Sequence, residues 1–484
     1  MFYLLDPILN EVNAMIVIDK KSNLPYYEQI YQQIKEQIIT QQIPANQKLP
    51  STRDLSADLM VSRNTVINSY SQLEVEGFIK SIGGSGYYVE QLNLPVSSSF
   101  DSFSNHVDHS IHTEHTPCKY DFQYGDLDYN CYKIKSLKKC ITNAIDTLSV
   151  QQRLFYSSKE GIPELREALS HYLFLSRGVK CSPDQIIITS GHQYSLNIIA
   201  HLFSSEHWIF AMEEPGYDGT RAIFEQNKYK ITPVPLETDG IAIKDLHNLK
   251  KTLLYITPSH QFPMGSVLSI AKRLSILKWA ETNHGYIIED DYDSELRYHT
   301  HSIPSLQSID QNNRTIYLGT LSKSLSPDLR IAFVVLPKTL VSYYHEKERL
   351  SYCSVPSFLQ MALAEFMISG YYQKHINTLR TYYKKKNKCI LKLLEESNTD
   401  HMTLYGSDAG LHFVLSIPTH LEQPDIIEAF AKNNIQVYPT DIYWMDKKHC
   451  PKNQILVGYS SIPMKDIKNA MKLFFITLHD LSKQ

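Results

Sequence analysis

The sequence predicts an α/β protein in two parts, a small helical unit with a β-hairpin and a much larger domain of alternating helices and strands. Residues 24–90 carry three helical apolar patterns followed by a glycine-rich hairpin pattern. Residues 91–119 lose this periodicity and are expected to be a flexible linker. In residues 120–484, short apolar runs alternate with helical patterns, which is typical of helices packed on a mainly parallel sheet.

The composition excludes several classes of protein. A net charge of −3 and 43% hydrophobic residues describe an ordinary soluble chain of 484 residues. Its seven cysteines are scattered and form no CxxC pair, which argues for reduced thiols and against a disulfide framework or a zinc site. No apolar run approaches the roughly 18 residues that cross a bilayer. A secretory signal begins with basic residues, whereas the N-terminal segment of this chain carries Asp6 and Glu11. We therefore expect a cytoplasmic protein with no membrane partner.

The first helix is predicted over residues 24–41. Apolar residues recur there at the i, i+3, i+4 and i+7 spacing of a helix with one buried face. The residues before it, 1–23, are expected to be an N-terminal extension, in which Met15 begins an Ile-Val-Ile pattern typical of a strand.

Two serines mark the starts of the next two helices. Ser51, with Asp54 three residues later, fits a capping box for a helix that ends at Leu59. Ser62 caps a third helix over residues 63–76. Its inward stripe is Val66, Tyr70 and Leu73. The exposed N-terminal end of this third helix is where a recognition helix meets the major groove of DNA.

A hairpin follows the third helix. Gly77 closes the helix, and residues 78–89 fit two short strands joined by a glycine-rich tip. The order is therefore helix, helix-turn-helix and wing. The motifs that carry a specific resemblance are Leu49-Pro50-Ser51-Thr52-Arg53, Val61-Ser62-Arg63-Asn64-Thr65-Val66 and Leu73-Glu74-Val75-Glu76-Gly77-Phe78. They resemble the DNA-binding domain of GntR-type bacterial transcription regulators.

This resemblance implies that Arg53 and Arg63 contact DNA. The neighbouring positions that it implies are Ser51, Ser62, Asn64, Thr65 and Gly86. The charge balance supports only weak non-specific binding, because residues 22–90 hold 5 Lys/Arg against 7 Asp/Glu. The alternative is a winged helix that contacts proteins, with Arg53 and Arg63 as surface charges.

The expected linker, residues 91–119, contains four histidines at positions 106, 109, 112 and 115. A histidine cluster can bind a metal ion, but no carboxylate or cysteine spacing accompanies this one. A solvated tether is the favoured interpretation, and we predict no metal site.

Lys323 is the most informative residue of the large domain. It lies on a loop between two apolar runs, residues 315–318 and 331–336, which are expected to be buried strands. Thr320, Ser322 and Arg330 flank it and are suited to hold a phosphate beside its amine. This combination suggests pyridoxal 5′-phosphate (PLP), whose aldehyde forms a Schiff base with a lysine. The alternative for this stretch alone is a solvated loop rich in serine and lysine.

Three further segments follow predicted strands, where ligands of α/β sheets bind. Gly191, His192 and Gln193 open a helix whose N-terminus is a natural phosphate seat. Tyr217 follows the next strand and offers an aromatic ring to a flat cofactor, although a turn tyrosine is an equal alternative. Residues 289–292 end another strand; there Asp290 can hold a pyridine nitrogen and Tyr292 can reach a ring hydroxyl. A solvated acidic loop is the alternative for that motif alone.

The order and spacing of these motifs resemble the PLP domain of fold-type-I aminotransferases. Behind a GntR-type winged helix, they resemble the MocR subfamily of regulators over residues 24–484. The resemblance implies Lys323 as the Schiff-base lysine, Asp290 on the pyridine nitrogen, Tyr292 on the ring oxygen and Tyr217 as the stacking ring. It implies a phosphate site formed by Gly191, His192, Gln193, Thr320, Ser322 and Arg330.

Two departures from the aminotransferase pattern matter. Phe262-Pro263-Met264-Gly265 replaces the usual Asn-Pro-x-Gly, so an asparagine contact to the ring hydroxyl is missing. Aminotransferases also hold the substrate carboxylate with an arginine from the C-terminal region, and this chain has no arginine after Arg380. Arg221 is the nearest alternative cation for an effector carboxylate; its other interpretation is a surface or phosphate-side ion pair.

The expected function is therefore a homodimeric, PLP-dependent transcription regulator that binds an operator in double-stranded DNA. The signal is expected to be PLP itself, in control of vitamin B6 synthesis. Two alternatives remain: a regulator that responds to an amino acid such as γ-aminobutyrate, and a working aminotransferase with a vestigial DNA-binding domain. A residual transaminase half-reaction is compatible with the regulator.

Overall fold

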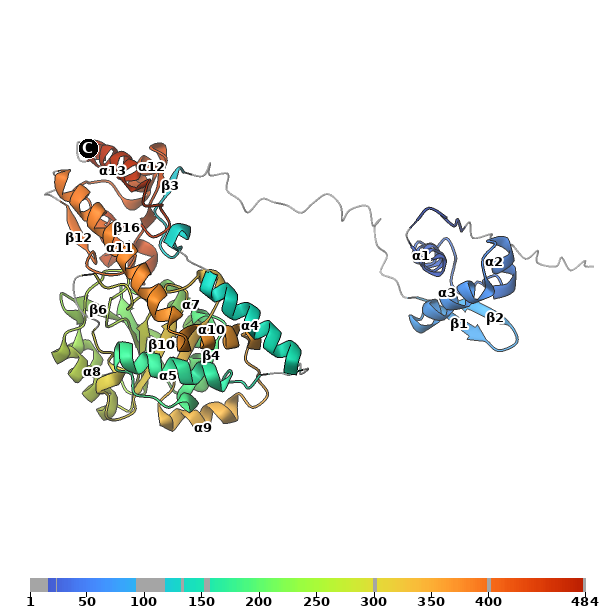
Figure 1. Ribbon diagram of the computed structural model, residues 1–484, viewed down its shortest axis with the longest axis horizontal. Helices are drawn as coiled ribbons and strands as arrows, with labels where there is room; N and C mark the ends of the chain where they lie inside the picture. The colour runs from blue at the N-terminus through green and yellow to red at the C-terminus, as the bar shows by residue number, and fades with distance from the viewer. Residues whose placement is uncertain are drawn as a thin grey trace, which may run out of the picture. The chain divides into compact units, whose positions relative to one another are not determined.

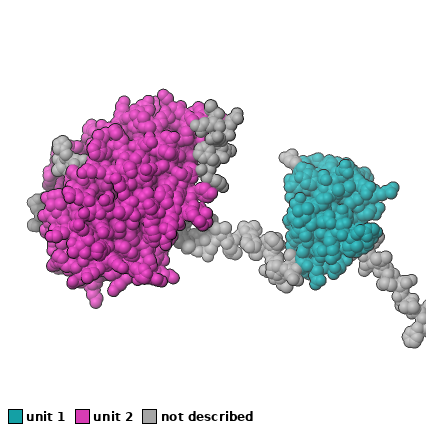
Figure 2. Space-filling model, turned by 90° about the horizontal axis from the view of Figure 1, so that it is seen from below, with its two compact units in different colours: residues 1–113 teal, residues 114–484 magenta. Residues whose placement is uncertain are grey.

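A computed structural model describes residues 16–22, 24–92, 118–131, 135–151, 157–298, 303–397 and 402–481. The chain divides into two compact units, residues 1–113 and 114–484 (Figure 2). The predicted histidine cluster and the first 15 residues lie outside the described residues. The segment boundaries given above remain predictions, and each unit is described by itself.

The first unit has three helices and a hairpin, as the apolar periodicity predicts. Its elements are α1 (Tyr26–Ile39), α2 (Thr52–Asp58), α3 (Arg63–Val75), β1 (Ile79–Ile82) and β2 (Gly86–Val89). Both predicted N-caps are confirmed. The Ser51 hydroxyl accepts the backbone N–H of Asp54, and the Ser62 hydroxyl accepts that of Thr65, each at 3.2 Å. The caps supply partners for helix donors that would otherwise have none.

The core of this unit lies between α1, α3 and the hairpin. Val66, Tyr70 and Leu73 of α3 are fully buried, which confirms the predicted inward stripe. The strand expected at residues 16–18 is wrong. Instead, Ile16 packs into this core, and the Val17 N–H donates to the Gln33 side chain of α1 at 2.9 Å. A side-chain amide satisfies the backbone there, so no strand partner is needed.

The second unit is built on an eight-stranded sheet in the order β4-β11-β10-β9-β8-β5-β6-β7. Six strands run in one direction, and β11 and β7 run against their neighbours, so the sheet is mainly parallel as predicted. The strands are β4 (Ile186–Thr189), β5 (Ile209–Glu214), β6 (Ile231–Glu237), β7 (Gly240–Ile241), β8 (Thr252–Ile256), β9 (Tyr286–Asp291), β10 (Thr315–Thr320) and β11 (Ala332–Val335).

Helices cover both faces of this sheet (Figure 1). One face packs on α6 (His192–Leu202), α7 (Asp218–Gln226) and α9 (Lys338–Lys347). The other face packs on α4 (Lys135–Gln151), α5 (Pro163–Arg177), α8 (Ile270–Thr282) and α10 (Ser357–Ile368). Alternate residues of one strand reach opposite faces: Ile187 joins the first layer, whereas Ile186 and Ile188 join the second.

The long helix α11 (Tyr371–Glu396) joins this layered region to a C-terminal region, at the other end of the unit in Figure 1. Its first half packs with α5 and α10, and its second half packs in the C-terminal core. The remaining elements are β3 (Tyr120–Asp121), β12 (Thr403–Tyr405), β13 (His412–Ser416), α12 (Gln423–Lys432), β14 (Ile435–Gln436), β15 (Tyr438–Pro439), β16 (Gln454–Gly458) and α13 (Ile467–Leu481). In the described part of the chain, no helix is long and apolar enough to cross a membrane.

Candidate cofactor site and candidate DNA interface

A cavity of about 150 Å³ lies where β8, β9 and β10 end. Its lining is Tyr124, His192, Tyr217, Tyr255, Thr257, Phe262, Asp290, Tyr292, Thr320, Ser322, Lys323 and Arg330. The carboxyl ends of parallel strands meet at one edge of a sheet, so motifs far apart in the sequence come together there.

Lys323 lies on the loop between β10 and β11, as predicted. Its Nζ donates to the Gly125 carbonyl at 3.0 Å and lies 4.4 Å from the centre of the Tyr124 ring. Burial lowers the pKa of Lys323 to about 8, while Asp293 and Asp126 act in the opposite direction. Near neutral pH an appreciable fraction of this amine is therefore unprotonated and nucleophilic, which a solvated lysine is not.

Asp290 is 4% exposed at the end of β9. One carboxylate oxygen, Oδ2, accepts the Tyr255 hydroxyl and lies 3.3 Å from His192 Nε2. The other, Oδ1, has no hydrogen-bond partner among the described residues, although it is buried. Burial raises the pKa of Asp290. A buried acceptor without a donor is costly, so this oxygen fits the protonated nitrogen of a bound ring.

Aromatic side chains form the wall of the cavity. Phe262 makes edge contacts with Tyr217 and Tyr292, with ring centres 5.8 Å and 6.0 Å apart. The Tyr292 hydroxyl lies 3.1 Å from Nδ1 of His260, and Asp293 Oδ2 lies 2.7 Å from the same nitrogen. Phe262 places an apolar ring where aminotransferases have an asparagine, and Tyr292 lines the cavity as well.

The other end of the cavity is suited to an anion. Gly191 is the N-cap of α6, whose first backbone N–H groups and dipole favour a negative charge. A side chain at Gly191 would lie only 2.6 Å from the Arg330 guanidinium, so glycine leaves room for Arg330. The φ of Gly191, 98°, also favours glycine. Thr320 and Ser322 line the cavity beside these groups. Together these groups fit the phosphate of PLP.

Three predicted residues are not among those that line the cavity, namely Gly191, Gln193 and Arg221. Gln193 is exposed on the first turn of α6. Arg221 of α7 donates from Nη2 to the Ile442 carbonyl at 2.8 Å. Four lining residues were not predicted as site residues: Tyr124, Tyr255, Thr257 and Phe262. Tyr255 has a weak sequence signal, a phenol within an apolar strand; Tyr124 has none, because its position depends on how residues 118–131 pack back on the sheet.

The candidate DNA interface lies at the N-terminal ends of α2 and α3. Ser51, Arg53, Ser62, Arg63 and Asn64 are exposed, whereas Thr65 is partly buried beside its cap. Arg63 Nε donates to Thr52 Oγ1 at 3.3 Å, so the two helix starts meet. Gly86, the first residue of β2, has a φ of 113°, and a side chain there would lie 3.3 Å from the Lys48 side chain. The structure thus presents two arginines and several short polar groups on one exposed surface.

Comparisons with known protein families agree with both units. Residues 26–89 match "Bacterial regulatory proteins, gntR family", and residues 119–443 match "Aminotransferase class I and II". The second match covers more than half of the chain. The fold and the two matches define a class, a winged helix-turn-helix regulator fused to an aminotransferase-type domain.

Several transcription regulators align with this chain over most of its length. The chain is 34% identical to the HTH-type transcriptional regulator YdeL of Bacillus subtilis, over 94% of this chain and 97% of YdeL. It is 30% identical to the probable rhizopine catabolism regulatory protein MocR of Rhizobium meliloti, over 96% of each chain. It is 28% identical to the pyridoxine biosynthesis regulator PdxR of Corynebacterium glutamicum, over 86% of this chain and 88% of PdxR. The chain belongs to the MocR subfamily of GntR-type transcription regulators.

Solved structures support the fold of the second unit. A kynurenine aminotransferase of Pyrococcus horikoshii, solved with PMP, matches 75% of this chain and 92% of its own length, with a TM-score of 0.68. The two sequences are 23% identical, so this likeness describes the fold alone.

Proposed function

We propose that this protein is a DNA-binding transcription regulator that holds PLP at Lys323, and that PLP itself is the signal. In this proposal the winged helix binds an operator, and the aminotransferase-like domain reports the supply of vitamin B6. The observation that carries the proposal is the pairing, in one cavity, of a buried amine of lowered pKa with an unsatisfied carboxylate oxygen of Asp290.

The residues of the chain divide the work of binding. Lys323 supplies the amine that can condense with the PLP aldehyde, and Asp290 can keep the ring nitrogen protonated. Tyr217 and Phe262 exclude water from the ring. Arg330 and the N-terminus of α6 hold the phosphate. PLP, when bound, supplies an electrophilic carbon at which an amine can exchange.

The choice of PLP over an amino acid as the signal is supported by the charges of the cavity. Arg330 is the one guanidinium in the lining, all of which lies within the described residues. If Arg330 holds the phosphate, no second guanidinium remains to clamp a substrate carboxylate bidentately. Arg221 binds a backbone carbonyl outside this lining. The relative PdxR, named for pyridoxine biosynthesis, is consistent with this choice.

The proposed partner is a palindromic or repeated DNA site bound by a homodimer, because a helix-turn-helix reads half-sites in pairs. PLP can shift the DNA-binding equilibrium only by its differential affinity for two conformations of the dimer. A covalent link together with a bound phosphate provides a large affinity from which such a difference can arise.

The test uses full-length protein freed of PLP and a DNA site selected by the protein from a random pool. Titration with PLP should change the DNA affinity or the transcription from a promoter that carries the site. Titration of PLP-loaded protein with amino acids, including γ-aminobutyrate, should change neither. Lys323→Ala is the matched control and should not respond to PLP.

The opposite result, no effect of PLP and a clear effect of an amino acid, would remove PLP as the signal. Arg221→Gln would then test the predicted carboxylate partner. Steady turnover of an amino acid with a keto acid would instead favour the working aminotransferase.

A further inference from the structure

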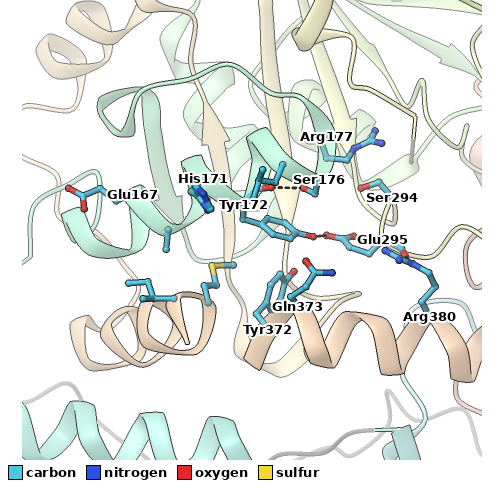
Figure 3. Close-up of a pocket in the computed structure, with 14 residues that line it drawn as sticks. Glu167, His171, Tyr172, Ser176, Arg177, Ser294, Glu295, Tyr372, Gln373 and Arg380 are labelled. Carbon is cyan, nitrogen blue, oxygen red and sulfur yellow. Dashed lines mark hydrogen bonds between the residues drawn. The ribbon is translucent and has the colours of Figure 1, made fainter. Parts of the chain in front are cut away.

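A second and larger cavity, of about 680 Å³, lies on the side of α5 and α11 (Figure 3). Side chains of α5, of the end of α10, of the first half of α11 and of the segment after β9 line it. None of its lining residues lines the Lys323 cavity. A volume of this size accepts a small metabolite.

The inner end of this cavity carries a carboxylate. Glu295 Oε1 accepts the Tyr172 hydroxyl at 3.2 Å, and Figure 3 shows the two side chains end to end. Burial, and then the charge of Asp291, raises the pKa of Glu295 to about 7. A bound ammonium group would stabilise the ionised carboxylate, because an opposite charge nearby favours the charged form.

Arg380 lies next to Glu295, and Arg177, which also lines the cavity, opposes the rise in the pKa of Glu295. Arg380 Nε donates to the backbone carbonyl of Glu295 at 2.8 Å. Among the described residues, no ion pair joins the Arg380 guanidinium to the Glu295 carboxylate. A cation and an anion therefore face one cavity side by side, which suits a ligand that carries both an ammonium and a carboxylate group.

The mouth of the cavity is apolar. Leu175 of α5 and Ile368 at the end of α10 are 69% and 71% exposed, and Met367 lies beside them. Two large aliphatic side chains so exposed on facing helices leave apolar surface that a ligand can cover.

We propose that this cavity is a second small-molecule site, which binds an amino acid with an apolar side chain. The ammonium group contacts Glu295, the carboxylate contacts Arg380, and the side chain lies against Leu175 and Ile368. This inference goes beyond the proposed function and does not depend on PLP binding.

The site is connected to the Lys323 cavity through one short segment. Asp290 and Tyr292 line the Lys323 cavity, and Ser294 and Glu295 line the second one. Between them, Asp291 forms a buried ion pair of 2.6 Å with Arg177, a lining residue of the second cavity. The two cavities thus share one short segment of backbone, which this buried ion pair holds in place.

The test measures binding by isothermal titration calorimetry to full-length Lys323→Ala protein, in which the amine of the first cavity is absent. The probes are L-phenylalanine and L-leucine, with phenethylamine and 3-phenylpropionate as analogues that keep one head group each. L-phenylalanine or L-leucine should bind, and each analogue of phenylalanine should bind at least about tenfold more weakly.

Two further substitutions in that protein locate the site. Glu295→Gln should weaken amino-acid binding about tenfold or more and leave the binding of 3-phenylpropionate unchanged. Arg380→Gln should also weaken amino-acid binding, but it should leave the binding of phenethylamine unchanged. Glu167→Gln, an exposed carboxylate at the rim of the same cavity, is the matched control and should bind as before. Circular dichroism and melting temperature verify that each variant is folded.

Three results would overturn the proposal. The first is that neither amino acid binds the Lys323→Ala protein. The second is that the folded Glu295→Gln and Arg380→Gln variants bind the amino acid as tightly as the Lys323→Ala parent. The third is that the wild type binds an amino acid only when Lys323 is present. The last of these would place an amino-acid effector in the first cavity.

Discussion

The two candidate sites of this protein are built in opposite ways. The candidate DNA residues all lie within positions 51–86, on exposed ends of elements that are set by local signals such as the caps at Ser51 and Ser62. The candidate cofactor residues are collected from strand ends along the chain. Lys323 donates to Gly125, 198 residues away.

This difference has an energetic consequence. At the DNA surface, an exposed side chain contributes mainly through what it binds, because it makes few contacts within the protein. In the Lys323 cavity, burial changes the chemistry of the side chains even before a ligand arrives, because it lowers the pKa of Lys323 and raises the pKa of Asp290. Substitutions in the two sites should therefore affect different measurements.

The largest expected effect is that of Lys323→Ala. The visible absorption of protein-bound PLP should be abolished, because Lys323 is the one lysine among the described residues that line the cavity. The helices of the first unit should be unaffected, since each unit has its own core. Absorption spectra and circular dichroism of the purified variant measure both. An unchanged visible spectrum would mean that PLP is bound elsewhere.

Arg63→Ala should affect only the DNA surface. If Arg63 contacts a guanine edge, the variant should lose about 1–3 kcal/mol of binding free energy at the selected DNA site. Binding to random DNA should change less, and the PLP spectrum should not change. Fluorescence anisotropy with both DNAs makes the comparison, with Lys80→Ala, in the hairpin, as a control cation of the same unit. Equal losses on both DNAs would make Arg63 a phosphate contact.

The pH dependence of PLP incorporation tests whether burial lowers the pKa of Lys323. Lys323 reacts as the neutral amine, and its pKa is about 8. As pH falls below about 8, the rate of PLP incorporation should fall toward tenfold per pH unit, whereas above 8 it should level off. A solvated lysine analogue should instead continue to gain reactivity up to its ordinary pKa. Stopped-flow absorbance follows both reactions. A rate that still rises steeply from pH 9 to 10 would contradict a desolvated lysine.

The same contrast explains what could be predicted from the sequence. The helices of the first unit and both of its caps followed from apolar spacing and serine positions within a few residues. Six of the eight strands of the large sheet followed from short apolar runs, and their common edge followed from the rule for parallel sheets; β6 and β7 were not predicted. Tyr124 and Tyr255 could not be found in this way, because their contacts with Lys323 and Asp290 depend on segments distant in the sequence. The second cavity was not foreseen either. It needs α5, α11 and residues 294–295 to meet, and none of these carries a motif.

Ser62 offers the smallest expected effect and separates folding from recognition at one residue. Its hydroxyl accepts the Thr65 N–H at 3.2 Å and contacts the Thr65 hydroxyl at 2.8 Å, but the side chain is exposed. Ser62→Ala should therefore lower the local stability of α3 by about 1 kcal/mol, the typical contribution of an N-cap. Ser62→Asp keeps a cap and adds a negative charge where DNA phosphates are expected, so it should retain stability but weaken DNA binding. Amide hydrogen exchange in α3 and DNA affinity distinguish the two roles. If the exchange rates of the alanine variant match those of the wild type, the cap does not stabilise α3. If the aspartate variant binds DNA as tightly as the wild type, this helix end does not face the phosphates.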